Sequence, residues 1–410
     1  MRGSIFLFAT DLHDEGPETV LDNVQGRAGL QGVTLACAYH HARDIFPHNP
    51  VRKVRFLEGG TVFFRPDPRR YDGLRITPQI SRLATEIDVL ADLGGRCARR
   101  GLAVRAWTVF LHNTTLGARH PDCVLQNVFG DPYITNLCPA NPEVRAFACA
   151  LAADLAGRGV ETILAESLGY GEFDHGYHHE RAFIALSPVA RLLLGLCFCP
   201  HCTRAIGAAG VAVERVRAFV RAELARVLDG TANALPAGAV DHAEIAALAD
   251  GELGRFLRAR ERIVTSLVAE VRAAVEAAGA SRFVPMDMAG AMLGYATGAP
   301  TGPPAPASAW REGLDPAAVA GAAHGLAAIG YARDPARLRG DLAAYRDLVP
   351  PDRERVVALR PMLPDCDSAT NLTMKVALLR EFGVSWADFY HYGFMRLDAL
   401  DWIGEALAGE

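Results

Sequence analysis

Residues 134–142 read Ile-Thr-Asn-Leu-Cys-Pro-Ala-Asn-Pro, and residues 197–202 read Cys-Phe-Cys-Pro-His-Cys. The two stretches hold four cysteines at a spacing typical of metal ligands: Cys138, Cys197, Cys199 and Cys202. Four thiolates are the ligand set of a closed, tetrahedral structural zinc site. Between the two stretches, Glu166 ends the apolar run Thr-Ile-Leu-Ala-Glu. The pattern predicts a structural zinc (Zn) ion beside a strand that ends in a carboxylate.

Short β-rich runs alternate with alanine-rich helical patterns on both sides of these stretches. Eight runs are predicted to be strands: Ile5–Asp11, Gly32–His40, Ala103–Leu111, Thr162–Glu166, Phe283–Met288, Gly325–Tyr331, Arg355–Arg360 and Ser385–Tyr390. The predicted helices include Pro78–Arg100, Pro142–Arg158, Pro335–Leu348, Ala369–Phe382 and Leu397–Ala408. Eight strands alternating with helices predict an α/β fold, the (β/α)8 TIM barrel. A doubly wound open sheet is the rival, but no Gly-x-Gly-x-x-Gly follows the first strand.

Two segments interrupt this alternation. Lys53–Tyr71 contains two alternating runs about a Gly-Gly pair, which predicts a β-hairpin in the second βα-loop. From about Ser187 to Ser281 the pattern is largely helical, and the Cys-Phe-Cys-Pro-His-Cys stretch lies near its start. We therefore expect a single barrel domain over residues 1–410, with a helical insertion at 187–281 after the fourth strand.

The composition is that of an ordinary globular protein, with 50% hydrophobic and 22% charged residues among 410. A net charge of −5 gives no electrostatic signal for nucleic acid or an anionic membrane. A chain of this size needs no disulfides, so its nine cysteines favour a reducing compartment. The first apolar run is short and leads into Asp11, which favours a strand over a signal peptide. These features predict a cytoplasmic protein.

The cysteine pattern resembles that of the family 42 β-galactosidases, which are barrel enzymes of glycoside hydrolase clan A. Cys138-Pro139-Ala140-Asn141-Pro142 is similar to the family's upstream cysteine and helix start, and residues 197–202 are similar to its Cys-x-Cys-x-x-Cys. The resemblance implies a glycosidase barrel with one structural zinc ion and with Glu166 as the acid/base carboxylate. It covers residues 130–205 in detail. Ala165 replaces the family's Asn, and the seventh strand lacks the family's Glu, so the substrate is not carried over.

The reactive groups of a TIM barrel lie at the C-terminal ends of its strands. Polar and aromatic residues stand at or just beyond these predicted ends: Asp11, His13, His40, His41, His112, Asn113, Tyr170, Glu172, Tyr331, Arg333, Arg360, Tyr390 and His391. This mixture is typical of a sugar site, which needs partners for hydroxyl groups and aromatic faces for C–H groups. Glycoside hydrolysis also requires two carboxyl groups. We expect Glu166 as the acid/base and Asp365 as the nucleophile or base, with Asp287 and Asp367 as rivals.

Two other functions stay open at this point. A catalytic metal bound by the rim loop would make the chain a metal-dependent hydrolase or lyase, with candidate ligands His175, His178, His179 and Glu180. Their spacing matches no His-Glu-x-x-His pattern. A non-catalytic sugar-binding barrel is the other alternative, favoured by Ala165 and by the missing Glu on the seventh strand. The expected partner is a small carbohydrate or glycoside; the helical insertion offers a lid or a homo-oligomer interface.

Overall fold

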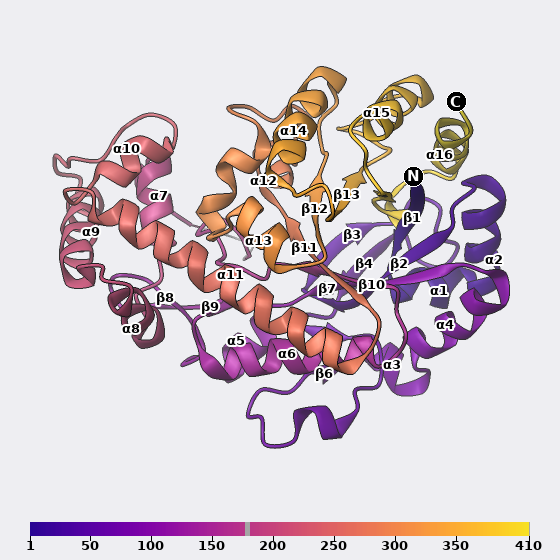
Figure 1. Cartoon of the computed structure of the whole chain (residues 1–410), viewed down its shortest axis with the longest axis horizontal. Helices are drawn as coiled ribbons and strands as arrows, with labels where there is room; N and C mark the ends of the chain where they lie inside the picture. The colour runs from indigo at the N-terminus through magenta and orange to yellow at the C-terminus, as the bar shows by residue number, and fades with distance from the viewer. Residues whose placement is uncertain (177–180, 410) are drawn as a thin grey trace.

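The centre of the molecule is a closed barrel of parallel strands (Figure 1). This computed structural model describes residues 1–176 and 181–409. The barrel strands are β1 (Arg2–Leu7), β2 (Gly32–Tyr39), β7 (Ala103–Val109), β10 (Thr162–Glu166), β11 (Arg282–Asp287), β12 (Gly325–Ile329), β13 (Glu354–Leu359) and β14 (Trp386–Phe389). Each strand pairs in parallel with the next, and β14 pairs with β1 to close the ring. The predicted (β/α)8 barrel is confirmed.

Helices connect successive barrel strands and cover the barrel from outside. The first three connections contain α1 (Ala9–Glu15), α2 (Pro17–Asp22), η1 (Asn23–Arg27), η2 (Pro68–Tyr71), α3 (Arg82–Glu86), α4 (Val89–Arg100), α5 (Thr114–Arg119) and α6 (Pro142–Ala156). The fourth contains α7 (Pro188–Leu194), α8 (Pro200–Ala208), α9 (Val213–Leu228), α10 (His242–Ala247) and α11 (Glu252–Ala278). The remainder are α12 (Ala289–Gly294), η3 (Ala305–Glu312), α13 (Pro316–Ala322), α14 (Pro335–Leu348), α15 (Ala369–Glu381), η4 (Tyr392–Phe394) and α16 (Asp398–Ala408).

Capping side chains explain why several helices begin where the sequence predicts. Asn141 accepts a 2.9 Å hydrogen bond from the Glu143 amide at the start of α6, and Asp334 accepts one of 2.8 Å from Ala336 at the start of α14. The predicted helix Pro78–Arg100 is wrong as a single element. It is divided into α3 and α4, because Asp88 is extended and caps a new helix by accepting from the Ala91 amide.

The second βα-loop contains a hairpin whose pairing differs from the prediction. β4 (Val54–Leu57) pairs with the upstream β3 (Ala42–Ile45), and not with the run after the Gly-Gly pair. That run, β5 (Thr61–Val62), pairs antiparallel with β2 and parallel with β6 (Gln79–Ile80). Gly60 makes the change of direction: its φ is +66°, and its amide donates to the Tyr39 carbonyl at 2.9 Å.

The helical segment after β10 has an apolar core of its own, and α11 belongs to both cores. Leu253 and Phe256 in the first half of α11 pack with α7, α8 and α9, whereas Val271 and Val275 in its second half pack in the barrel core. Figure 1 shows α11 running from the insertion helices to the barrel. One continuous helix therefore sets the position of the insertion over the rim. None of the helices in the described ranges combines the length and the apolar character needed to cross a bilayer.

Inward-facing side chains fill the barrel in layers below the rim. Near the N-terminal ends of the strands, Arg105 Nη1 and Asp388 Oδ2 form a buried ion pair of 2.5 Å. Above them, the rings of Phe6 and Tyr390 contact Trp107, with centroids 5.0 and 5.8 Å away. These rings close the barrel and form the floor of the space above.

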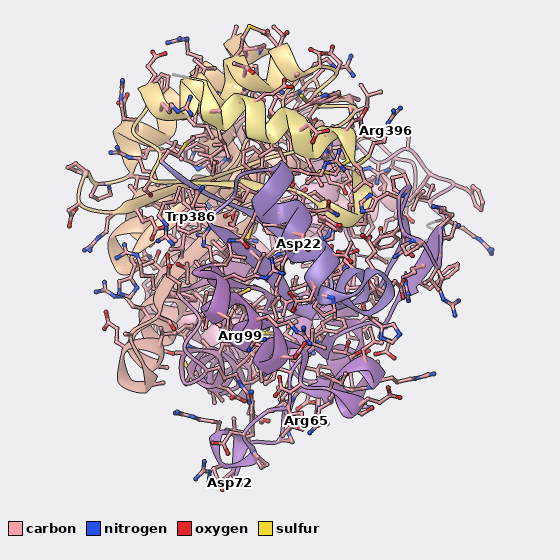
Figure 2. The ribbon with its side chains drawn as sticks, turned by 90° about the vertical axis from the view of Figure 1, so that its right-hand side faces the viewer. Asp22, Arg65, Asp72, Arg99, Trp386 and Arg396 are labelled. Atoms are coloured by element: carbon pink, nitrogen blue, oxygen red, sulfur yellow. The ribbon has the colours of Figure 1, made fainter. Side chains whose placement is uncertain are left out.

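Figure 2 shows one outer side of the barrel, where Asp22 and Arg99 lie at the surface and the loop with Asp72 projects.

A second short hairpin precedes the first cysteine. β8 (Val124–Gln126) pairs antiparallel with β9 (Pro132–Leu137), and Cys138 follows β9 directly. The amide of Cys138 donates to the Cys123 carbonyl at 2.8 Å, and the amide of Phe198 donates to the Gln126 carbonyl at 2.7 Å. The hairpin therefore brings the two cysteine stretches together at one side of the rim.

Candidate active site

A cavity of about 370 Å³ lies at the C-terminal ends of the barrel strands. Its size is within the range of sites for small ligands. Seven aromatic residues line it from different strands and loops: Phe6, Tyr39, Trp107, Tyr170, Tyr295, Tyr331 and Tyr390. The polar lining comes mainly from His40, Asn136, Glu166, Glu172, His175 and Glu312. The described lining contains three glutamates and two histidines, and no aspartate, lysine or arginine.

Glu166 faces the cavity because side chains alternate along β10. Leu164 points into the barrel and Ala165 points towards the helices, so Glu166 points inward again. The Glu166 side chain is buried, and its Oε2 accepts a 2.6 Å hydrogen bond from Trp107 Nε1. Burial raises the pKa of Glu166 to about 7, although the Trp107 hydrogen bond acts to lower it. A carboxyl group with this pKa can donate or accept a proton near neutral pH.

Two further glutamates line the same cavity. Burial raises the pKa of Glu172, but the nearby charges of Arg311 and Arg260 favour its ionised form. Burial raises the pKa of Glu312 well above its usual value, and the charges of Glu172 and Glu166 act in the same direction. The site thus combines carboxyl groups whose surroundings differ, which is the arrangement required for separate acid and base roles. The sequence analysis missed Glu312, because it ends η3, an irregular segment that no strand pattern places.

Asp365, which we predicted as the nucleophile or base, does not line the cavity. Its side chain is buried and forms an ion pair with Arg360 Nε. The Arg360 guanidinium lies 4.7 Å from the ring centroids of both Tyr295 and Tyr331. Asp365 therefore holds the arginine that supports two aromatic wall residues, and Arg360 itself stands behind the wall.

The rival aspartates are also outside the cavity. On β11, Met286 points inward, so the next residue, Asp287, points towards the helices. Asp287 accepts hydrogen bonds from the Tyr345 hydroxyl at 2.7 Å and from the Ala289 amide at 2.9 Å. Burial raises the pKa of Asp287 to about 6. Asp367 is exposed. Neither can serve as the second carboxyl group of this cavity.

His40 and His175 line one side of the cavity, and the buried His112 contacts both of their rings. The His40 ring stacks on Tyr39 and on His112, with centroid distances of 4.2 and 4.5 Å, and His112 meets the edge of His175 at 4.9 Å. Burial lowers the pKa of His112 to about 2, and the neighbouring histidines add to this effect, so the ring is neutral. The rings of His40 and His112 are within 16° of parallel, so their in-plane lone pairs do not converge on one point.

The metal-binding alternative depended largely on residues outside the described ranges: His178, His179 and Glu180. Of that predicted set, the described His175 lines the cavity. Within the described residues, His40, His112 and His175 do not form a group with ligand atoms close enough to share one ion. The described part of the histidine wall therefore offers ring faces and hydrogen-bonding nitrogens to a polar ligand.

The remaining predicted residues divide between the cavity and its surroundings. Tyr170, Tyr331 and Tyr390 line the cavity, as does His40. Asn113 instead caps α5 by accepting from the Leu116 amide at 2.9 Å, and Arg333 Nε donates to the Pro364 carbonyl at 2.6 Å. The predicted residues away from the cavity lining also include the half-buried His41 and the exposed His13.

Asp11 and His391 lie buried beside the rim and do not line the cavity. Asp11 belongs to α1, not to the predicted first strand, and its Oδ2 accepts a 2.8 Å hydrogen bond from the Phe8 amide. His391 Nδ1 lies 3.9 Å from the same oxygen. Burial raises the pKa of Asp11 to about 8 and lowers that of His391 well below its usual value. The surroundings therefore favour two neutral groups that support the first and last strand ends.

The four predicted metal ligands come together. Cys138 Sγ lies 3.5 Å from Cys199 Sγ and 3.4 Å from Cys202 Sγ. Cys197 completes the group, and its four sulfur atoms all lie within 4.8 Å of one another. All four are buried and none is in a disulfide. This geometry and donor set fit a metal ion. The Tyr170 hydroxyl lies 3.4 Å from Cys202 Sγ, so one cavity residue touches the cluster directly.

Comparison with known proteins places the fold among glycosidase-like barrels. No protein-family model and no curated protein sequence matches the chain. Three solved structures are similar to it. The α-L-fucosidase isoenzyme 2 from Paenibacillus thiaminolyticus has a TM-score of 0.56 and 12% identity, over 100% of this chain and 49% of that one. The β-galactosidase from the psychrophilic Marinomonas ef1 has a TM-score of 0.54 and 11% identity, over 99% and 59%.

The third is the catalytic domain of β-amylase from Paenibacillus polymyxa, with a TM-score of 0.54 and 10% identity, over 97% of this chain and 94% of that one. The chain thus spans about half of the fucosidase and three fifths of the galactosidase. At these identities the likeness concerns the fold. The chain is a (β/α)8 TIM barrel, similar in fold to these three enzymes.

Proposed function

We propose that this chain is a glycoside hydrolase that cleaves a small carbohydrate or glycoside in the cavity at the barrel rim. The observation that carries the proposal is Glu166, a buried carboxyl group with a pKa of about 7, set against Trp107 in an aromatic cavity. Such an environment keeps a carboxyl group protonated at the pH where it must donate a proton. The three similar structures are a fucosidase, a galactosidase and an amylase, which supports a carbohydrate substrate.

Glu172 is the best candidate for the second carboxyl group. It lines the cavity with Glu166, and Arg311 and Arg260 favour its ionised form. In the proposed reaction, Glu166 gives its proton to the leaving oxygen as the glycosidic C–O bond breaks. Glu172 acts on the anomeric carbon, either directly or by activating the water that supplies the new hydroxyl group. Glu312 stays protonated beside them and can donate a hydrogen bond to a sugar hydroxyl.

The cavity walls favour a neutral sugar unit at the point of cleavage. Tyr39, Tyr331 and Tyr390 offer ring faces, on which the C–H side of a pyranose can pack. Among the described lining residues there is no arginine or lysine to pair with an anionic group. The ionised carboxylate of Glu172 would repel such a group. We therefore assign this cavity to an uncharged sugar ring.

We also propose that the four cysteines bind a structural zinc ion. Four thiolates complete a tetrahedron and leave no open position for a substrate, so the ion would fix structure. Its expected effect reaches the site through Tyr170, which contacts both Cys202 and the cavity. The resemblance to the family 42 β-galactosidases agrees with this assignment and with the role of Glu166.

The test is hydrolysis of a panel of aryl glycosides by the wild type, Glu166→Gln and Asp287→Asn. Loss of a general acid lowers the rate by roughly 10²–10⁴-fold, so we expect Glu166→Gln to fall by this factor. Asp287→Asn replaces another buried carboxyl group, outside the cavity, and we expect its rate to stay within a few-fold of the wild type. Wild-type rates in Glu166→Gln would contradict the proposed role.

A sugar-binding barrel is the second candidate, and one observation favours it. Arg360 directly follows the seventh strand, β13, and is paired with Asp365, so this strand end supplies no carboxylate to the cavity. On this reading the wild type would hydrolyse none of the glycosides. Calorimetry would still detect sugar binding, with similar affinity in the wild type and in Glu166→Gln.

A further inference from the structure

A second cavity, of about 230 Å³, adjoins the first and shares Gly171 and Glu172 with it. Helices of the insertion form much of its wall, through α7 and α11, and η3 closes another side. Its charge differs from that of the first cavity, because its lining contains three arginines, Arg191, Arg260 and Arg311, against the two acidic residues Glu172 and Asp174. Two cavities with a common wall therefore have opposite preferences for charge.

Arg260 is the most unusual residue of this second cavity. Its side chain is buried, with the residue only 1% exposed, and its Nη2 donates to the Arg311 carbonyl at 3.1 Å. Its Nε and Nη1 have no acceptor among the described residues. The guanidinium lies 4.3 Å from the Tyr170 ring centroid, so the ring fixes its plane. A buried cation with unpaired donors is costly unless an anion joins it.

Neighbouring charges do not satisfy these donors. Asp174 pairs with Arg191 at 2.5 Å, and Glu172 lies on the wall between the two cavities. The cysteine cluster contacts the Tyr170 hydroxyl, whereas Arg260 lies over the Tyr170 ring, so the charge of the cluster acts on Arg260 through space and not through a hydrogen bond. Arg311 Nε is also buried, and it has no acceptor within residues 1–176 and 181–409. Two guanidinium groups in one cavity thus keep unpaired donors.

We propose that the second cavity binds the anionic group of an acidic sugar unit, a carboxylate or a sulfate, through Arg260 and Arg311. Guanidinium groups suit both anions, because their planar donors match two oxygens at once. The inference rests on the proposed function in one respect: the acidic unit is the neighbour of the neutral unit in the first cavity. Glu172, on the shared wall, then lies next to the bond between the two units. The insertion becomes the part of the chain that selects an acidic substrate.

Small anions test the site without knowledge of the whole substrate. Titration calorimetry with glucuronate, with sulfate and with glucose compares a carboxylate, a sulfate and a neutral sugar. We expect saturable binding of at least one anion at millimolar concentration or below, and at least tenfold weaker binding of glucose. Arg311→Gln and Arg260→Gln should each weaken anion binding at least tenfold. Arg258→Gln, which removes an exposed arginine from the same helix, should bind the anion as the wild type does.

The outcomes separate this inference from the proposed function. Absence of binding for both anions, or unchanged binding in Arg311→Gln, would overturn the anion site. Arg311 is only partly buried, so this variant decides the question even if Arg260→Gln fails to fold. Anion binding that depends on the two arginines, in a protein that hydrolyses no glycoside, would keep the site and reject the hydrolase. If both stand, Arg311→Gln should lower kcat/KM for disaccharides that carry a uronic-acid unit next to the neutral unit, relative to kcat/KM for neutral disaccharides. This ratio cancels any common effect on Glu172.

Discussion

Trp107 and Glu166 are joined by a 2.6 Å hydrogen bond between neighbouring strands of the barrel. The register pairs Trp107 with Leu164, so the indole stands one inward position below the carboxyl group. Two opposing effects act on the same proton. Burial favours the neutral carboxyl group, whereas the indole N–H favours the carboxylate, and together they leave the pKa at about 7. The pKa of Glu166 therefore depends both on burial and on the hydrogen bond from the Trp107 indole.

Trp107→Phe should shift the pH dependence of hydrolysis upwards. Without the indole donor the carboxylate of Glu166 loses its stabilising partner, so its pKa rises above about 7. A hydrogen bond to a charged group contributes about 1.5–3 kcal/mol, which corresponds to roughly 1–2 pH units. A proton donor works below its pKa, so the alkaline limb of kcat/KM should move up by this amount.

Trp386→Phe is the matched control for this shift. Trp386 also donates its indole N–H inside the barrel, to Ser4 Oγ at 2.7 Å, but in the polar layer below the cavity. Its removal should lower stability and leave the alkaline limb near pH 7. An alkaline limb that stays in place in Trp107→Phe would mean that another group donates the proton.

Asp365→Asn should destabilise the protein with little direct effect on the reaction. The change leaves Arg360 buried beside the cavity without its counter-charge, and breaking such a pair costs about 3–5 kcal/mol. Urea denaturation would measure this loss. The double variant Asp365→Asn/Arg360→Met should recover part of it. A stable Asp365→Asn protein whose rate is roughly 10³-fold lower would instead place Asp365 in the chemistry.

Asp11→Asn should make the protein more stable at alkaline pH. The pKa of Asp11 is about 8 in the folded protein and about 3.9 in an unfolded chain, so the folded form binds the proton more tightly. The contribution to stability is complete below pH 4 and is lost as the pH rises towards 8. The loss is at most about 1.4 kcal/mol per pH unit.

Thermal denaturation across this pH range checks the prediction. Asn cannot ionise, so the variant should show a flatter profile and a higher midpoint than the wild type at pH 8. The exposed Asp367 provides the control, since Asp367→Asn should follow the wild-type profile. Equal slopes in Asp11→Asn and the wild type would show that Asp11 does not carry this dependence.

The barrel was predictable from the sequence because its strands are short apolar runs separated by helices with clear N-terminal caps. Thr162–Glu166 and Pro335–Leu348 have the predicted bounds. The hairpin pairing was not predictable in this way, because Ala42–Ile45 carries a weak pattern and the second run finds its partner in β2. Pairing between distant strands depends on tertiary packing, which a local pattern does not contain.

The same limit applies to the site. Strand ends place residues at the rim, and this was enough to locate Glu166 and Tyr390 in the cavity lining. It was not enough to tell inward from outward positions, since Asp287 differs from the inward Met286 by one residue. Glu312 and Asp365 follow irregular segments, so their positions depend on how those segments fold over the rim.

Cys199→Ser should remove the metal and loosen the site without changing the reacting groups. We expect about one zinc ion per wild-type chain and much less in the variant, because a closed tetrahedral site needs all four thiolates. Because the proposed ion would join β9 to the insertion, the thermal midpoint should fall by roughly 10 °C. The variant Cys149→Ser, outside the cluster, should keep as much zinc as the wild type. Elemental analysis and thermal denaturation measure both effects.

Hydrolysis should decline in Cys199→Ser because structure is lost around Tyr170. A chelator separates this effect from a catalytic metal. If the chelator stops catalysis but leaves the fold and the bound zinc intact, a different metal takes part in the reaction.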